Sequence, residues 1–225
     1  MPTFVVRVWM PDRPGALGAV ASRIGSVRGD LIGIDILERG GGRAIDELVV
    51  HLADACLVPL LAREIAQVDG VDVEDVRPVV DALDPRLDAL ETAAYLVTRT
   101  SVSDLLTALA ERSAHDLEAD WAAVVDLHAP LPVVAVGPVP PAPWLAAFVA
   151  GSRVSMASRS DDSGPDDVVW ADLSGADLVV VIGRRGRPYR ARERRQLTAV
   201  GRIADHRWTE LVTRPAMLLH PSVTT

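Results

Sequence analysis

At 225 residues the chain suits one large domain or two small ones, and with 49% apolar but only 4% aromatic residues, leucine, valine and alanine must fill its cores. Its formal net charge of −8 disfavours nonspecific attraction to nucleic acid or to anionic lipid. The single cysteine, Cys56, excludes an internal disulfide framework and any cysteine-based metal cluster.

Two further features of the whole chain set expectations about its setting. The longest apolar runs are far too short to cross a bilayer, and the N-terminus begins with an alternating strand instead of an apolar signal core. We therefore expect a cytoplasmic protein with no membrane partner. All 23 basic residues are arginine and asparagine is absent, a composition typical of a GC-rich, actinobacterial-type genome.

The first 80 residues follow the order β-α-β-β-α-β. Strands are indicated where apolar residues alternate, and helices where they recur every three or four positions. Gly29 is expected to end the first helix, and Pro59 is tolerated because it falls in the first turn of the second. Two helices on one face of a four-stranded antiparallel sheet would bury these apolar stripes, which predicts a ferredoxin-like half of an α+β protein. The predicted elements are a strand at 3–9, a helix at 17–27, a hairpin of strands 30–37 and 48–52 with its turn at 40–42, a helix at 57–68 and a strand at 71–79.

A distinctive loop connects the first predicted strand to the first predicted helix. Its Pro-Gly turn leads into a helix start, which leaves backbone amides without partners at the positive end of the helix dipole. Amides in that position can hold a carboxylate. The structural alternative is a tight turn in which the aspartate merely caps the helix. The loop, called the 12–17 loop below, consists of Asp12, Arg13, Pro14, Gly15, Ala16 and Leu17.

Residues 3–80 resemble an ACT domain, the small regulatory module found on many enzymes and regulators of amino-acid metabolism. The resemblance rests on the first strand, the 12–17 loop, the helix after it and the run Asp30-Leu31-Ile32, where ACT domains commonly carry Asn at the first position. It implies that an amino acid or a related carboxylate is the ligand. We expect the loop amides to meet the carboxylate and the loop aspartate to receive the ammonium group, while the loop arginine orients the carboxylate or faces solvent. The expected ligand-binding residues are Asp12, Arg13, Pro14, Gly15, Ala16, Leu17, Asp30 and Leu31.

Residues 30–37 are expected to form an edge strand. The segment contains neither proline nor lysine and is apolar in its middle, so it is poorly protected against pairing. Either the second half of the chain covers this edge, or two copies pair edge to edge into an eight-stranded sheet, as many ACT domains do. We expect the homodimer, in which Asp30 and Leu31 of one subunit approach the loop of the other. Ligand binding and dimer geometry would then be coupled.

The second half of the chain is expected to form a small α/β domain. Its order is similar to that of a GAF-type domain, a sensor fold related to PAS domains, and the resemblance is strongest at residues 178–189 and the helix start that follows. The predicted domains are an ACT-like domain at 1–80, a connecting helix at 81–98, a GAF-like domain at 99–212 and a tail at 213–225. The elements expected within the second domain are a helix from Val102 to Leu109, strands at 121–127 and 132–137, a short helix at 144–150, a polar turn at 155–165, strands at 168–170 and 177–182, and a long helix at 192–211. Four tryptophans are expected to anchor its core or rim: Trp121, Trp144, Trp170 and Trp208.

Residues 184–195 concentrate seven arginines against a single acid, Glu193. Because charge runs usually form paired or solvated faces, we expect the acidic stretches 161–177 and 69–91 to neutralise them. The alternative is a patch that binds phosphate or nucleic acid. No recognition helix, aromatic interleaving or RNP-like motif accompanies the arginines, so a nucleic-acid partner is not expected. The seven are Arg184, Arg185, Arg187, Arg190, Arg192, Arg194 and Arg195.

The sequence offers no recognisable catalytic or metal-binding pattern. The five histidines are scattered, the acidic residues near 161–167 lack EF-hand spacing, and no P-loop, dinucleotide fingerprint or nucleophile elbow occurs. We therefore expect a regulatory sensor without cofactor or metal, not an enzyme. Two other classes stay open: a constitutive dimerisation module that binds no ligand, and an anion-binding or nucleic-acid-binding regulator that uses the arginine run.

Overall fold

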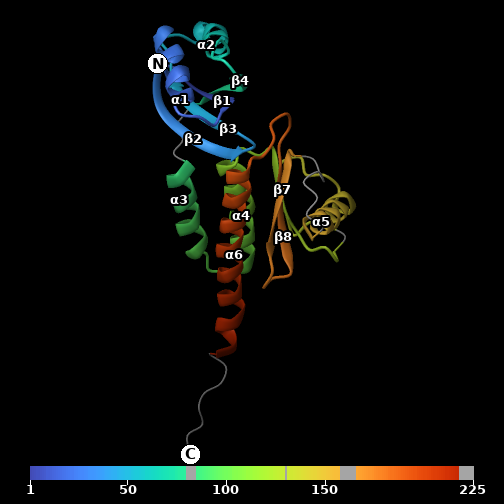
Figure 1. Ribbon diagram of the computed structural model, residues 1–225. Helices are drawn as coiled ribbons and strands as arrows, with labels where there is room; N and C mark the ends of the chain where they lie inside the picture. The colour runs from blue at the N-terminus through green and yellow to red at the C-terminus, as the bar shows by residue number, and fades with distance from the viewer. Residues whose placement is uncertain (80–84, 130, 158–165, 218–225) are drawn as a thin grey trace, which may run out of the picture. The chain divides into compact units, whose positions relative to one another are not determined.

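The computed structural model describes residues 1–79, 85–129, 131–157 and 166–217, and the chain divides into two compact units (Figure 1). The first unit comprises Met1–Asp84 together with Arg190–Arg192, and the second comprises Pro85–Tyr189 together with Glu193–Thr225. Each unit contains one four-stranded antiparallel sheet with helices, so the protein is a mixed α+β chain. None of the described helices is both long and apolar enough to cross a bilayer.

The first unit has the strand and helix order expected from its sequence. Its sheet runs β2-β3-β1-β4 with every neighbouring pair antiparallel, which is the ferredoxin-like arrangement. Its elements are β1 (Thr3–Pro11), α1 (Ala16–Ser26), β2 (Asp30–Gly40), β3 (Arg43–His51), a short 3₁₀ turn (Ala55–Leu57), α2 (Val58–Ile65) and β4 (Asp72–Val79).

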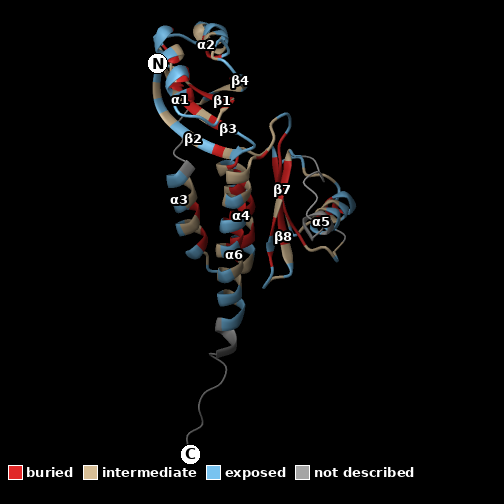
Figure 2. Ribbon diagram, viewed as in Figure 1, coloured by how far each residue is buried: buried red, intermediate tan, exposed pale blue. Residues whose placement is uncertain are grey.

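The core of the first unit lies between the two helices and one face of the sheet. Alternate residues of β1 and β3 are fully buried there, among them Val6, Val8 and Leu48. Figure 2 shows which parts of each element are buried. Val20 of α1 and Leu61 of α2 complete the same cluster at helical spacing. This period-two pattern on the strands and 3.6-residue pattern on the helices is the one that predicted these elements.

The end of α1 differs from the expectation. The helix ends at Ser26, and Arg28, not Gly29, adopts the left-handed backbone with φ 60°. Gly29 is required for a different reason, because a Cβ at this position would lie 2.9 Å from the Ile24 side chain and 3.2 Å from that of Val50. The glycine therefore permits close packing of the turn against the sheet.

The edge strand β2 carries two bulges that the sequence did not reveal. The pairing with β3 shifts register between Leu31 and Gly33 and again between Ile36 and Glu38. β2 is at the end of the sheet order, as expected for residues 30–37. Bulges are one of the devices that protect an edge, so β2 is better protected than its lack of proline and lysine suggested.

The second unit packs helices against both faces of its sheet, whose order is β6-β5-β8-β7. One apolar cluster lies between the sheet and α3, α4 and α6, and a second lies between the opposite face and α5. The elements are α3 (Pro85–Val97), α4 (Val102–Asp116), β5 (Trp121–Val125), β6 (Val134–Val136), α5 (Ala142–Ala157), β7 (Val168–Leu173), β8 (Leu178–Gly183) and α6 (Ala191–Met217).

Three helices of the second unit are longer than expected, and the first of them, α4, continues to Asp116, beyond the predicted Leu109. α5 has 16 residues where a short helix was predicted, and it includes 155–157 from the expected turn. α6 continues past the predicted end at 211 and includes the first residues of the expected tail. Thr213 donates its hydroxyl to the Thr209 carbonyl at 2.7 Å, a contact that belongs to a continuing helix. Residues 81–84, 158–165 and 218–225 of the predicted connector, turn and tail lie outside the described residues.

Three of the four tryptophans anchor the second unit as expected. Trp121 is buried and Trp170 packs beside it, while Trp208 packs against the cluster on the other face. Trp144 does not join them, because 42% of it is exposed and it stacks on Phe148 at a ring-centroid distance of 5.4 Å. Trp144 is therefore not a core anchor, and it reaches the cluster only through Phe148, as a residue at the rim does.

Candidate ligand-binding site

The 12–17 loop leaves β1 and enters α1 through a left-handed glycine. Gly15 is the N-cap residue with φ 88° and ψ −15°, a conformation that side chains with a Cβ disfavour. No side chain caps the helix, so Asp12 does not perform the capping role of the structural alternative. Its backbone amide instead donates to the Gly42 carbonyl at 2.9 Å and ties the loop to the β2–β3 hairpin.

The amides at the start of α1 remain largely open. The Ala16 amide donates to the Arg13 carbonyl over a long 3.3 Å, whereas the amides of Gly15 and Leu17 donate to no hydrogen bond within the part of the chain that the structure describes. Gly15 is exposed, and no atom lies within 4 Å of where its Cβ would be. The positive end of the helix dipole is therefore accessible to an anion.

The charged side chains of the loop differ in their surroundings. Oδ1 of Asp12 lies 3.9 Å from Nε of Arg39, on the edge strand. Arg13 is 62% exposed and lies 3.8 Å from the fully exposed carboxylate of Asp69. This geometry favours the solvent-facing interpretation of Arg13 over a role in orienting the ligand.

Asp46 is a candidate site residue that the sequence reasoning missed. It occupies a core-facing position of β3, only 4% of it is exposed, and its Oδ1 is buried without a hydrogen-bond partner. Burial raises the pKa of Asp46, Arg39 opposes that rise, and the carboxylates of Asp12 and Asp35 add to it. The sequence did contain one sign of this residue. Alternate positions of β3 from Ala44 onward are apolar, and Asp46 is a charged residue at one of them.

Register places part of β2 beside Asp46 on the helix-facing side of the sheet. Directly opposed residues of an antiparallel pair point to the same face, and Ile36 is opposed to Asp46, as Ile34 is to Leu48. Both isoleucines are exposed, at 42% and 44%. This stretch of the sheet thus offers a carboxylate and apolar surface close to the open helix end.

Asp30 and Leu31 lie at the opposite end of the sheet from the loop. Both pair with the last residues of β3, which lie beside the first residues of β1. The loop instead follows the last residue of β1. The two ends of β3 are eight residues apart, which corresponds to a separation of about 26 Å. One chain therefore does not bring the eight expected site residues together. An antiparallel pairing of two β2 edges would bring Asp30 of one copy toward the loop end of β2 in the other.

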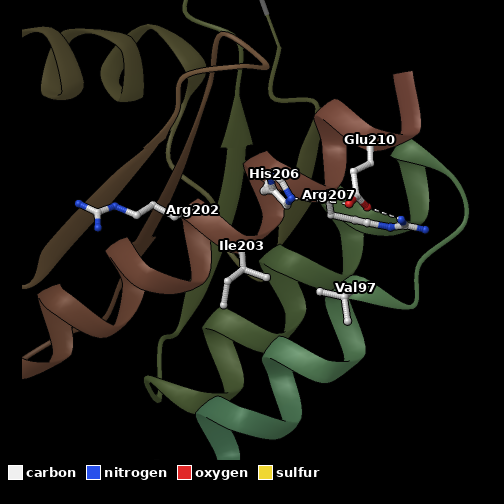
Figure 3. Close-up of a pocket in the computed structure, with 6 residues that line it drawn as sticks. All are labelled: Val97, Arg202, Ile203, His206, Arg207 and Glu210. Carbon is white, nitrogen blue, oxygen red and sulfur yellow. Dashed lines mark hydrogen bonds and ion pairs between the residues drawn. The ribbon is translucent and has the colours of Figure 1, made fainter. Parts of the chain in front are cut away.

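A pocket of about 390 Å³ lies in the second unit and includes none of the loop residues (Figure 3). Val97 of α3 and Ile203 of α6 line it with hydrocarbon. Its one carboxylate, Glu210, is engaged by Arg207 at 2.6 Å, and His206 Nε2 lies 3.6 Å from the same group. Its lining thus offers apolar contact and positive charge. Arg202 completes the set of lining residues.

The arginine run is paired rather than free to form a basic patch. Arg184 is buried beside Glu193, and Arg194 lies 3.3 Å from Asp166. Both stretches that were expected to neutralise the run contribute an acid, because Asp166 engages Arg194 and Glu74 engages Arg190. Arg192 pairs with Asp35 of β2 at 2.6 Å. The other acids come from the run itself and from the turn before β5, because β5 and β8 are neighbours. The further pairs are Arg187 with Glu118, and Arg185 with Asp120 at 3.7 Å.

The described residues also offer no metal centre, since no three His, Cys, Asp or Glu side chains among them are grouped so as to hold an ion.

The similarity of this chain to known proteins is confined to solved structures. No family model and no curated protein matches the chain. Among solved structures, it is similar to the ACT domain from GTP pyrophosphokinase of Chlorobium tepidum, at 15% identity over 35% of this chain and 100% of that one, with a TM-score of 0.29. It is also similar to an unknown protein from Galdieria sulphuraria, at 12% identity over 91% and 92% of the two chains, with a TM-score of 0.33. The first likeness fits the N-terminal part of this chain.

Proposed function

We propose that this chain is a regulatory protein whose first unit binds an amino acid or a related small carboxylate at the 12–17 loop. The observation that carries the proposal is the open helix start, where the amides of Gly15 and Leu17 have no acceptor within the described residues. The ferredoxin-like order of the unit and the resemblance of the loop to that of ACT domains support it.

In this proposal the ligand carboxylate accepts hydrogen bonds from the two open amides. The dipole of the 11-residue helix α1 stabilises the negative charge, and the exposed position of Gly15 admits the ligand without displacement of a side chain. The hydrogen bond from the Asp12 amide to Gly42 holds the loop in place before the ligand arrives. Binding therefore needs little reordering of the loop.

The same proposal includes a homodimer formed by two β2 edges. Pairing of two antiparallel edge strands would extend the sheet to eight strands and carry Asp30 and Leu31 of one copy toward the loop of the other. A ligand that contacts both copies would then bind the dimer more tightly than the monomer, which couples binding to assembly. A constitutive module without ligand is the competing possibility, and it would keep the same dimer at any ligand concentration.

Isothermal titration of the full chain with each of the twenty amino acids and with their 2-keto acids tests the proposal. We expect saturable heat with at least one compound. Gly15→Val should abolish it, because a left-handed φ disfavours valine and the new side chain would stand beside the amides. Gly186→Val is the matched control, since Gly186 also has positive φ (73°) and open space around it but belongs to the second unit. Absence of heat across the whole panel would contradict the proposal.

A further inference from the structure

Asp46 is a buried acid in an apolar setting. Strand β3 places Ala44 and Leu48 on either side of it along the same face, and both are buried in the core of the first unit. Carboxylates are almost never fully buried unless they are paired, because loss of hydration disfavours the charged form. Oδ1 of the Asp46 carboxylate has no hydrogen-bond partner within the described residues, so the free chain does not compensate its burial with a direct contact.

Its position relates it to the 12–17 loop. Asp46 is directly opposed to Val8 of β1, which shares the helix-facing core with Met10 near the end of that strand. Ala16, the first residue of α1, packs into the same core. The side of β3 that carries Asp46 therefore faces the start of the helix, where the open amides lie. Burial and nearby charges raise the pKa of Asp46, and Asp12 of the loop is one of those charges.

The charges around Asp46 leave room for a cation. Arg39 is the basic residue of this neighbourhood whose charge lowers the pKa of Asp46, and its Nε lies 3.9 Å from Asp12. Asp35 also acts on Asp46, but it lies on the opposite face of the sheet and is engaged by Arg192 at 2.6 Å. Among the described residues, the guanidinium of Arg39 therefore serves both Asp12 and Asp46. An added positive charge is the group that this cluster would bind best.

We propose that Asp46 recognises the ammonium group of the ligand, so that the first unit binds an α-amino acid and rejects the corresponding 2-keto or 2-hydroxy acid. This rests on the proposed function and identifies the class of ligand. The carboxylate of the ligand meets the amides of Gly15 and Leu17, and its ammonium group meets Asp46 with support from Asp12. The exposed isoleucines Ile34 and Ile36 favour an apolar side chain on that ligand.

The discrimination has a physical origin in the burial of Asp46. An ammonium group would form a charge-assisted hydrogen bond with a carboxylate that otherwise has no partner. A 2-keto acid would leave that carboxylate unpaired and would bring a second negative charge close to it. A site built to hydrogen-bond one group rejects the analogue that lacks it, because its own polar atoms then lose their partner.

The test is a titration of the full chain with apolar amino acids and with the 2-keto acid of each, for wild type and for Asp46→Asn. We expect the wild type to bind at least one amino acid about tenfold or more tightly than its keto acid. Asp46→Asn should weaken the amino acid by about tenfold and leave the keto acid unweakened, which removes the selectivity. Asp72→Asn is the matched control, because Asp72 lies in the same sheet but forms an exposed ion pair with Arg43, and this variant should keep the selectivity.

The outcomes separate this inference from the proposed function. Keto acids that bind wild type as tightly as amino acids would overturn the role of Asp46 and leave the sensor proposal standing. So would an Asp46→Asn variant with unchanged selectivity. Absence of binding by either series would contradict the sensor proposal, and this inference with it. Thermal unfolding of Asp46→Asn is the folding check, and we expect an unchanged or higher Tm.

Discussion

Arg184 and Glu193 form a buried ion pair in the second unit, with Nη2 and Oε1 2.6 Å apart. Arg184 follows β8, and Glu193 lies in the first turn of α6, where a negative charge also suits the helix dipole. The same guanidinium donates to the backbone carbonyl of Leu117 at 2.9 Å and stacks on Tyr189, with its central carbon 3.9 Å from the ring centroid. Burial lowers the pKa of Arg184, and Glu193 opposes that change. The first arginine of the run therefore joins a strand, a turn and a helix.

Removal of one partner of this pair should be costly. Glu193→Gln would leave a buried guanidinium without its counter-charge, and we expect a loss of about 3–5 kcal/mol in the free energy of unfolding. Chemical denaturation at neutral pH measures it. Asp166→Asn is the control, because its pair with Arg194 is exposed and should contribute less than about 1 kcal/mol. Equal effects of the two variants would contradict the structural role of Arg184.

A second charge network should give the first unit an acid-sensitive stability. Glu47 accepts from Arg7 at 2.8 Å and from Arg77 at 2.9 Å. Burial acts to raise the pKa of Glu47, but the two guanidinium groups outweigh it, and the net shift is downward from 4.5. A lowered folded-state pKa means that the stabilisation is present above the unfolded value of 4.5 and is lost as the pH falls through the folded pKa.

Glu47→Gln should therefore unfold more easily than wild type at neutral pH, and the difference in Tm should shrink as the pH falls below 4.5. Thermal unfolding followed across this pH range measures it. Asp75→Asn is a suitable control, because Asp75 lies 3.6 Å from Arg77 but is more exposed than Glu47. A difference in Tm that stays constant with pH would contradict the assignment.

The contribution of Asp46 to stability should change with pH in the opposite direction to that of Glu47. Its folded-state pKa is raised above 3.8, so protonation stabilises the fold, and this contribution is lost as the pH rises through the folded pKa. Asp46→Asn carries no such charge, so its advantage in Tm over wild type should grow from acid to neutral pH. The neighbouring charges that set this behaviour are Arg39, Asp12 and Asp35. A variant that is less stable than wild type at neutral pH would show that Asp46 has a stabilising partner.

The edge of β2 offers a test of the homodimer. Ile32→Lys places a charge at the first bulge, on a side chain that is 42% exposed, and lysine at an edge opposes strand pairing. We expect sedimentation velocity to show a shift from dimer to monomer. Leu60→Lys is the control, because Leu60 is a comparably exposed apolar residue (37%) on α2, away from the edge. A wild-type chain that is monomeric with and without amino acid would contradict the dimer.

The fold of the first unit could be predicted because its strands and helices carry separate periodic signals. Residues such as Val6, Val8 and Leu48 alternate toward one core, and that alternation indicates which face meets the helices. The bulges of β2 could not be predicted, since no residue in the strand marks them and they arise from pairing with β3. The limits of α5 were missed for a related reason, because tertiary packing extends a helix beyond its most periodic part.

The candidate site was only partly accessible to sequence reasoning. The loop was found because Pro14 and Gly15 stand between a strand and a helix, a local pattern with a local cause. Asp46 lies far from the loop along the chain, and only the register of β3 against β1 places it opposite Val8, on the strand that leads into the loop. The isolation of its carboxylate depends on which charges the fold brings near it, and no sequence spacing encodes that.

The most direct test of the central claim is an NMR titration that follows the backbone amide resonances of Gly15 and Leu17. The ligand is the amino acid that gives the largest heat in the calorimetric panel. We predict that both amide protons move downfield in a saturable manner, because each gains a charged acceptor. Saturable shifts elsewhere, for example at Val97 in the pocket of the second unit, with both loop amides unchanged, would contradict the account.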